Sequence, residues 1–180
     1  MSTHADANFS SADFSALTAS RRSTRAYMDQ QIPQDILDAI LKDATTAPSW
    51  SNTRAFRVAL ATGERADRLR EEYVRRFNQT LDIQHHKRFA TIKTALKREL
   101  PDGDFPVWKP YPKELRASQV EVAKLVYGAY GVERRDYEGR DNANRRNVSA
   151  FNAPVMGFVF VHENMLPWSA MDAGLMLQTL

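Results

Sequence analysis

The run Val155 to Val161 carries no charged side chain over seven consecutive residues. Such a run predicts a β-strand in the middle of a sheet, covered on both faces. Within it, Gly157 permits a close approach of another backbone segment. Much earlier in the chain, Phe56, Val58 and Leu60 alternate with other residues at the period of two that is typical of a half-buried strand. The chain is therefore expected to contain a sheet.

Much of the remaining chain has the apolar periodicity of amphipathic helices. A helix is predicted to start at Pro33, and the stretch from Glu64 to Leu100 predicts two helices with a break near Asn78. The spacings Ser10-x-x-Asp13 and Ser169-x-x-Asp172 are typical of capping boxes, in which a hydroxyl and a carboxylate satisfy the first amides of a helix. We therefore expect one helix to begin at each of these two positions.

Composition favours one globular domain over residues 1–180. The chain has 180 residues, of which 43% are hydrophobic and 26% charged, enough apolar surface for a core. Cysteine is absent, which excludes disulfides, thiolate nucleophiles and Cys-ligated metal or iron–sulfur centres. Any redox chemistry must therefore come from a bound cofactor.

Charge and hydropathy bear on partners and location. The net charge of +3 suits an anionic ligand such as a nucleotide and indicates nucleic acid only weakly. Met1 to Ser10 lack a basic start followed by an apolar run, and no stretch approaches the roughly 20 apolar residues of a membrane helix. We expect a cytoplasmic protein with no membrane partner and no nucleic-acid partner.

Four residues near the end of the first predicted helix suit a phosphate: Arg21, Arg22, Ser23 and Arg25. Each guanidinium can donate two parallel charge-assisted hydrogen bonds to phosphate oxygens, and the hydroxyl adds a further donor. Basic clusters are also common on solvated surfaces, where they steer ligands or aid solubility. By itself the cluster leaves both interpretations open.

A second segment, Ala47-Pro48-Ser49-Trp50-Ser51-Asn52, changes that balance. Taken with the arginine cluster, with Phe151-x-Ala153-Pro154-Val155 and with Trp168-Ser169-x-x-Asp172-x-Gly174-x-x-x-Gln178, it resembles the FMN-dependent nitroreductase family. The resemblance touches both ends of the chain, while residues 63–146 are less characteristic. The order of these motifs supports the resemblance more than any one of them.

The resemblance implies an α+β fold, with a central, mostly antiparallel sheet surrounded by helices and an intertwined homodimer. FMN is then expected at the dimer interface, with NADH or NADPH as electron donor. The implied phosphate and ribityl contacts are Arg21, Arg22, Ser23 and Arg25; the implied contacts near the ring are Pro48, Ser49, Trp50 and Asn52. Ser51 and Arg54 are the implied substrate contacts.

The activity implied by the resemblance is ping-pong hydride transfer from NAD(P)H to a small-molecule acceptor, a nitroaromatic or a quinone. The flavin carries this chemistry, so we assign no catalytic side chain. We also assign no metal site, because adjacent His85 and His86 point about 100° apart on a helix.

Two departures from the family pattern affect these expectations. Arg54 stands where the family usually has a neutral glutamine. The sequence also ends at Leu180, inside a predicted helix, whereas family members continue to a glycine-rich turn near the flavin. We therefore expect residues 1–180 to be a single nitroreductase-like domain that is incomplete at its C-terminus.

Three other interpretations remain open from the sequence. The same fold could carry dehalogenation, dehydrogenation or flavin breakdown. The chain could be a basic helical module that binds nucleic acid, with an affinity that falls steeply as salt rises. It could also be a structural fragment with no ligand.

Overall fold

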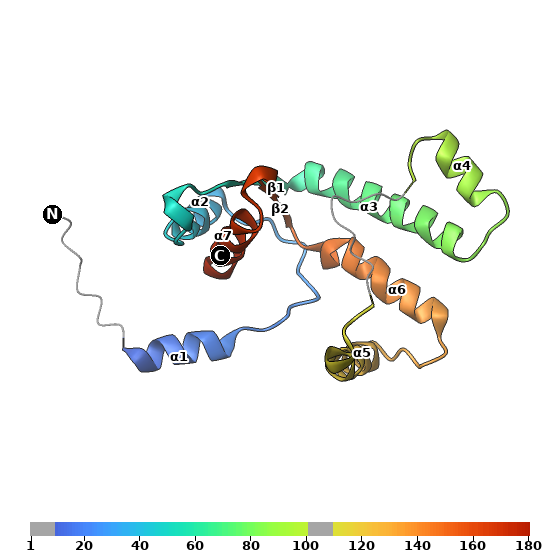
Figure 1. Cartoon of the computed structure of the whole chain (residues 1–180), viewed down its shortest axis with the longest axis horizontal. Coiled ribbons are helices and arrows are strands. Elements are labelled where there is room, and N and C mark those ends of the chain that lie inside the picture. The colour runs from blue at the N-terminus through green and yellow to red at the C-terminus, as the bar shows by residue number, and fades with distance from the viewer. Residues whose placement is uncertain (1–9, 101–109) are drawn as a thin grey trace.

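The computed structural model describes residues 10–100 and 110–180. Its regular elements, in chain order, are α1 (Ser11–Ser20), α2 (Gln34–Ala44), β1 (Phe56–Thr62), α3 (Gly63–Gln84), α4 (Ala90–Leu96), α5 (Arg116–Ala129), α6 (Tyr137–Val148), β2 (Val155–Val161) and α7 (Trp168–Thr179). Short 3-10 turns lie at Trp50–Asn52, Lys113–Leu115, Ala150–Asn152 and Glu163–Met165. Figure 1 shows the sheet near the middle, with α2 and α7 at one end and α3, α4, α5 and α6 toward the other.

The two strands pair antiparallel, so that Phe56 lies opposite Val161 and Thr62 opposite Val155. Both strands lie where the sequence predicts them. The prediction that residues 155–161 form a covered central strand is wrong for this chain, because β1 is the only strand beside β2 within the described residues. The ring of Phe160 is 60% exposed. A single copy of the chain therefore leaves part of this apolar strand exposed.

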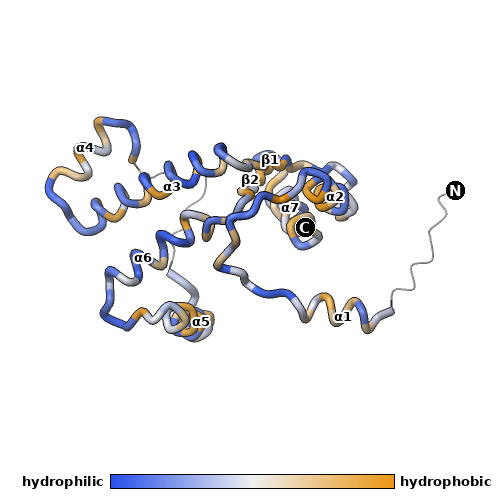
Figure 2. Tube along the Cα trace, turned by 180° about the vertical axis from the view of Figure 1, so that it is seen from behind, coloured by the Kyte–Doolittle hydropathy of each residue, from blue (hydrophilic) through white to orange (hydrophobic). Residues whose placement is uncertain are grey.

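Successive residues of each strand face opposite sides of the sheet, and each side carries one small hydrophobic core. On one face Phe56, Val58 and Val159 pack against Ala44, Ala47 and Met176, so α2 and α7 cover this face. On the other face Met156 and Phe158 pack with Ala61, Ala66 and Leu69 at the start of α3. Figure 2 shows hydrophobic colour on α2, α7 and the strands, and also on α5 and α1, which lie outside these two cores.

Helix α3 is continuous from Gly63 to Gln84, so the predicted break near Asn78 is wrong. Asn78 is instead used in packing, because its side-chain oxygen accepts a 2.9 Å hydrogen bond from Nε of Arg145 on α6. The chain turns later, where His86 and Phe89 both have positive φ. Asn in a helix interior is only mildly unfavourable, and this contact with α6 accounts for its place there.

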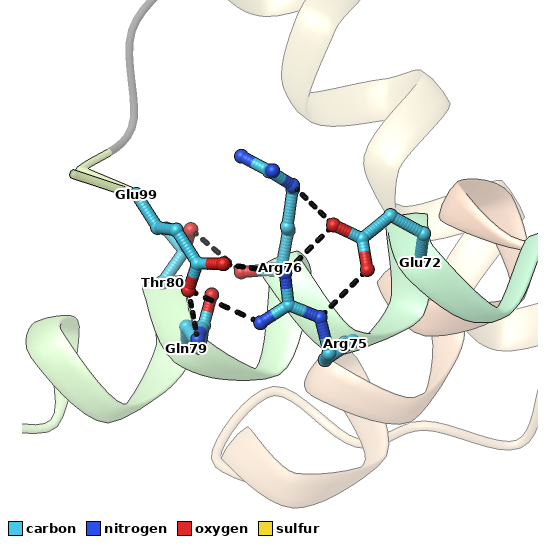
Figure 3. A network of polar contacts seen from close by, with 6 residues as sticks. All are labelled: Glu72, Arg75, Arg76, Gln79, Thr80 and Glu99. Carbon is cyan, nitrogen blue, oxygen red and sulfur yellow. Dashed lines mark hydrogen bonds and ion pairs between the residues drawn. The ribbon is translucent and has the colours of Figure 1, made fainter. Parts of the chain in front are cut away.

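Ion pairs tie the segment that follows α4 to the middle of α3 (Figure 3). Arg75 lies between two carboxylates, with Nε 2.7 Å from Glu72 and Nη2 2.9 Å from Glu99. Hydrogen bonds from Arg75 and Arg76 lower the pKa of Glu72 to about 2, and bonds from Arg75 and Gln79 do the same for Glu99. The two carboxylates in turn raise the pKa of Arg75. These charges fix the end of the α3–α4 hairpin where few apolar residues are buried.

The molecule is open rather than rounded. Helix α1 stands away from the other helices at the end of an extended arm, and none of its residues is buried (Figure 1). The chain exposes 15145 Å² of accessible surface, whereas a compact protein of 20.5 kDa exposes about 8,800 Å². Across residues 10–100 and 110–180, no helix is long and apolar enough to cross a membrane.

Candidate functional site

The segment between α2 and β1 forms a tight loop with an unusual backbone. Ser51, Asn52 and Arg54 have φ of 50°, 56° and 46°, the left-handed region that side chains other than glycine rarely adopt. Three such residues within four positions turn the chain sharply between Ser49 and the first residue of β1. A loop of this kind keeps its shape only when its surroundings determine it.

A buried carboxylate on α7 holds this loop. The backbone N–H of Trp50 donates to both oxygens of Asp172, at 3.0 and 3.1 Å, and Asp172 is only 1% exposed. The predicted capping box at residues 169–172 is therefore wrong. Helix α7 begins at Trp168, after Pro167, and the Ser169 hydroxyl donates instead to the carbonyl of His162 at 3.1 Å.

Stacking adds a second contact between the loop and α7. The rings of Trp50 and Trp168 lie nearly parallel, with centroids 4.7 Å apart and planes inclined by 15°. Trp50 remains 50% exposed, so part of the residue is accessible to a ligand. Trp50 was predicted from the sequence to lie at the site, whereas Trp168 and Asp172 were not. The only sequence signal for them was their place in a motif of the family.

Further hydrogen bonds close the loop on itself. The amide of Arg54 donates to the Ser49 hydroxyl at 3.2 Å, and the Thr53 hydroxyl donates to the carbonyl of Trp50 at 2.9 Å. The side chains of Ser51 and Arg54 are exposed. No ion pair to Arg54 occurs within the described part of the chain.

The arginine cluster lies on the extended arm between α1 and α2. Nη1 of Arg22 donates to the carbonyls of Ala19 and Arg21, at 2.7 and 2.9 Å, and Nη1 of Arg25 donates to the carbonyl of Ser23 at 3.4 Å. All of residues 21–25 are exposed. No hydrogen bond joins them to residues 48–54, both segments being in the described part. The structure thus assembles the Pro48–Asn52 loop but leaves the arginine cluster apart from it.

Basic residues elsewhere lie against neighbouring groups of the chain. The guanidinium of Arg140 lies 5.7 Å from the ring centroids of Tyr127 and Tyr137, and that of Arg146 lies 5.4 Å from Tyr130. Nε2 of His85 lies 2.9 Å from a carboxylate oxygen of Asp141. Among residues 10–100 and 110–180 no three His, Asp or Glu side chains gather as a metal site would require.

Comparisons with known proteins agree on one family. The family model described as "Nitroreductase family" matches residues 18–180. A 4-nitrobenzoate reductase of Pseudomonas putida is 31% identical over 169 residues, which are 93% of this chain and 66% of the relative. A 4-nitrobenzoate reductase of Nocardioides sp. (strain LMS-CY) is 33% identical over 168 residues, 93% of this chain and 62% of the relative. The chain thus spans about two thirds of the length of these relatives.

Solved structures give the same result. The FMN and NADPH-dependent nitroreductase NfnB from sphigopyxis sp. strain HMH superposes with a TM-score of 0.75 at 25% identity, covering 92% of this chain and 67% of that one. The FMN-dependent nitroreductase NfnB from Mycobacterium smegmatis, solved in complex with NADPH, matches with the same TM-score, identity and coverage. The expected nitroreductase-like fold is therefore confirmed.

Proposed function

This chain belongs to the nitroreductase family, and from that premise we propose that it forms part of an FMN-dependent oxidoreductase that uses NADPH or NADH to reduce nitroaromatic acceptors. The observation that carries the proposal is the loop at Trp50, which Asp172 and Trp168 hold in a strained shape. Strained backbone of this kind is typical of ligand-binding sites. The assigned ring contacts are Pro48, Ser49, Trp50 and Asn52.

The arginine cluster fits the phosphate of the same cofactor. In Arg22 and Arg25 a single terminal nitrogen makes the only hydrogen bonds that the described residues offer, and its acceptors are backbone carbonyls. The remaining N–H donors are available for phosphate oxygens. We propose that Arg21, Arg22, Ser23 and Arg25 bind the phosphate and the ribityl end.

When bound at this site, FMN would supply the chemistry of ping-pong hydride transfer between NAD(P)H and the acceptor. The chain's own contribution is then to bind, orient and select. Trp50 offers an exposed apolar ring and Asn52 an exposed amide on the same loop. We assign no side chain a proton-transfer role. Dehalogenation, dehydrogenation or flavin breakdown on the same fold would be told apart by analysis of products.

We propose that the site is completed by a second copy of the chain. The arginine cluster and the Pro48–Asn52 loop lie apart within one copy, and the arm that carries the arginines reaches away from α2 and α7 (Figure 1). A dimer in which the arm of one subunit meets the loop of the other would bring both sets of donors to one ligand. The large exposed surface of the single chain supports this assembly. We place the enzyme in the cytoplasm, where NAD(P)H is regenerated.

We further propose that the preferred acceptors carry a carboxylate. Two of the relatives are named 4-nitrobenzoate reductases. In this chain Arg54 presents an exposed cation on the loop, where it can attract the carboxylate of an acceptor lying over Trp50.

The flavin proposal has a direct spectroscopic test. We expect the purified protein, supplied with FMN and dialysed, to be yellow, and its absorbance near 450 nm to fall when NADPH or NADH is added without oxygen. Admitting 4-nitrobenzoate should restore the absorbance and consume the acceptor. A colourless protein that shows no saturable FMN binding by titration would overturn the proposal.

A further inference from the structure

We propose that Asp172 is a positioning residue for the Pro48–Asn52 loop, and that its buried carboxylate sets the affinity of that loop for flavin. This inference rests on the proposed function, because it assigns the loop to the flavin. It adds a residue that lies on α7, far from the loop in sequence, and that is covered by the protein.

Burying the carboxylate of Asp172 costs free energy unless hydrogen bonds or an ion pair compensate for its lost hydration. A carboxylate that is 1% exposed has given up its hydration, and such groups are retained in proteins where they are hydrogen-bonded or paired. Among the described residues no cation lies within ion-pair distance of it. The donor that reaches it there is the amide of Trp50, shared between both oxygens. The carboxylate is therefore dedicated to the loop.

The hydrogen bonds that hold the Trp50 amide also restrain the residues that follow it. Immediately after the bonded amide come Ser51 and Asn52, both with positive φ, and then Arg54, also with positive φ. Left-handed conformations at such residues relax unless neighbouring contacts prevent it. Without Asp172, the Trp50–Trp168 stack still joins the loop to α7, while the bonds from the Arg54 amide to Ser49 and from the Thr53 hydroxyl to Trp50 lie within the loop itself.

Fixing the loop before the ligand arrives raises affinity, because the ordering is already complete in the free protein. Asp172 therefore acts on flavin binding without touching flavin. A residue with a purely structural role would instead change the stability of the whole fold and leave the affinity of the folded protein unchanged.

The first measurement needs no flavin. Asp172→Ala and Asp172→Leu both remove the acceptor, one leaving a space and the other filling it, so that at least one is expected to fold. We expect the Trp50 amide to exchange with deuterium at least ten times faster in these variants, while the amides of α2 keep their protection. The near-ultraviolet circular dichroism of the stacked Trp50 and Trp168 should weaken in parallel.

The second measurement is titration with FMN. We expect Kd to rise at least tenfold in Asp172→Ala and Asp172→Leu, and Asp172→Asn to recover most of the affinity because an amide oxygen still accepts from Trp50. Ser169→Ala is the matched control. Ser169 is equally buried on the same helix but bonds to His162 rather than to the loop, so its loss should leave Kd unchanged.

The outcomes separate the two proposals. If wild-type protein binds no FMN, the proposed function fails, and deuterium exchange at Trp50 still decides whether Asp172 holds the loop. If wild-type protein binds FMN and the folded acceptor-free variants bind it equally well with an unchanged Trp50 amide, the positioning role is overturned. Loss of affinity in Ser169→Ala by the same factor would also overturn it, because any change in α7 would then suffice.

Discussion

Arg54 combines a left-handed backbone, with φ of 46°, and an exposed cationic side chain at the entrance to β1. Coulomb attraction between this cation and a carboxylate about 4 Å away is about 1 kcal/mol in bulk water and about 4 kcal/mol in a partly dry cleft. Because the side chain is exposed, the lower part of this range applies unless a ligand or a second copy excludes water. Arg54 is therefore suited to choosing between charged and neutral acceptors.

We predict that Arg54→Gln lowers kcat/KM for 4-nitrobenzoate about three- to tenfold and leaves kcat/KM for nitrobenzene nearly unchanged. Steady-state kinetics with both acceptors would measure the ratio, and Arg57→Gln, an exposed cation on β1, is the control. A ratio that Arg54→Gln does not alter would mean that Arg54 has no part in selecting substrates.

A separate prediction concerns the arginine cluster on the arm between α1 and α2. Arg22→Ala and Arg25→Ala should each weaken FMN binding roughly ten- to hundredfold, because a charge-assisted bond to phosphate contributes about 1.5 to 3 kcal/mol. Arg135→Ala, which removes an exposed guanidinium between α5 and α6, should have no effect. Full flavin occupancy of both arm variants after extensive dialysis would assign the cluster to the surface.

For single residues, the sequence predicted hydrogen bonds whose two partners lie close together in the chain. The capping box at Ser10 and Asp13 is present as expected, because both partners lie within one turn of helix. The same spacing at Ser169 and Asp172 was misleading, because the partner of Asp172 is an amide 122 residues away. Only the fold brings Trp50 to α7, so no local pattern could have predicted the bond.

Among the elements, the α3–α4 hairpin carries a network of ion pairs between partly exposed side chains. Arg75 bridges Glu72 and Glu99, and Gln79 adds a 2.9 Å bond to Glu99 (Figure 3). The pKa of both carboxyl groups is about 2, below the usual 4.5. A carboxyl group with a depressed folded-state pKa stabilises the fold above its unfolded pKa and loses this contribution as pH falls toward the folded value.

We therefore predict that the thermal stabilisation due to Glu99 is constant above about pH 5 and disappears between about pH 4.5 and 2. The Tm difference between wild-type protein and Glu99→Gln, followed against pH, measures it. Glu71→Gln, which removes an exposed carboxylate of the same helix, is the control. A difference that persists at pH 2 would show that Glu99 acts through packing and not through its charge.

Element positions followed closely from apolar periodicity, since both strands and the helix after Pro33 lie where the sequence predicts them. The break near Asn78 failed for a reason outside α3. Its side chain bonds to Arg145 on α6, and a helix that gains such a partner tolerates a weak helix former. The order of helices and strands could thus be predicted, whereas helix lengths depended on contacts between elements.

For the whole molecule, the resemblance supplied the fold, and the exposed apolar residues support the proposed dimer. Phe14 and Leu17 on α1 are 60% and 62% exposed, and Phe160 on β2 is 60% exposed. Exposed apolar side chains that share one face of an element are typical of association surfaces, and Phe14 and Leu17 share one face of α1. The apolar run at residues 155–161 predicted a covered strand, and the proposed dimer would provide covering that one copy lacks.

We accordingly predict that the protein is a dimer by light scattering and that replacing both Phe14 and Leu17 with Asp converts it to monomer. The two side chains lie one turn apart on the same face of α1, so charges there oppose burial against a second copy. Replacing Ser15 and Thr18 with Asp adds the same charge at the same spacing on another face and should leave the dimer intact. Because the arm of one subunit is proposed to meet the loop of the other, FMN affinity should fall together with the dimer. A monomeric wild-type protein that binds FMN tightly would show instead that one copy folds its arm onto its own loop.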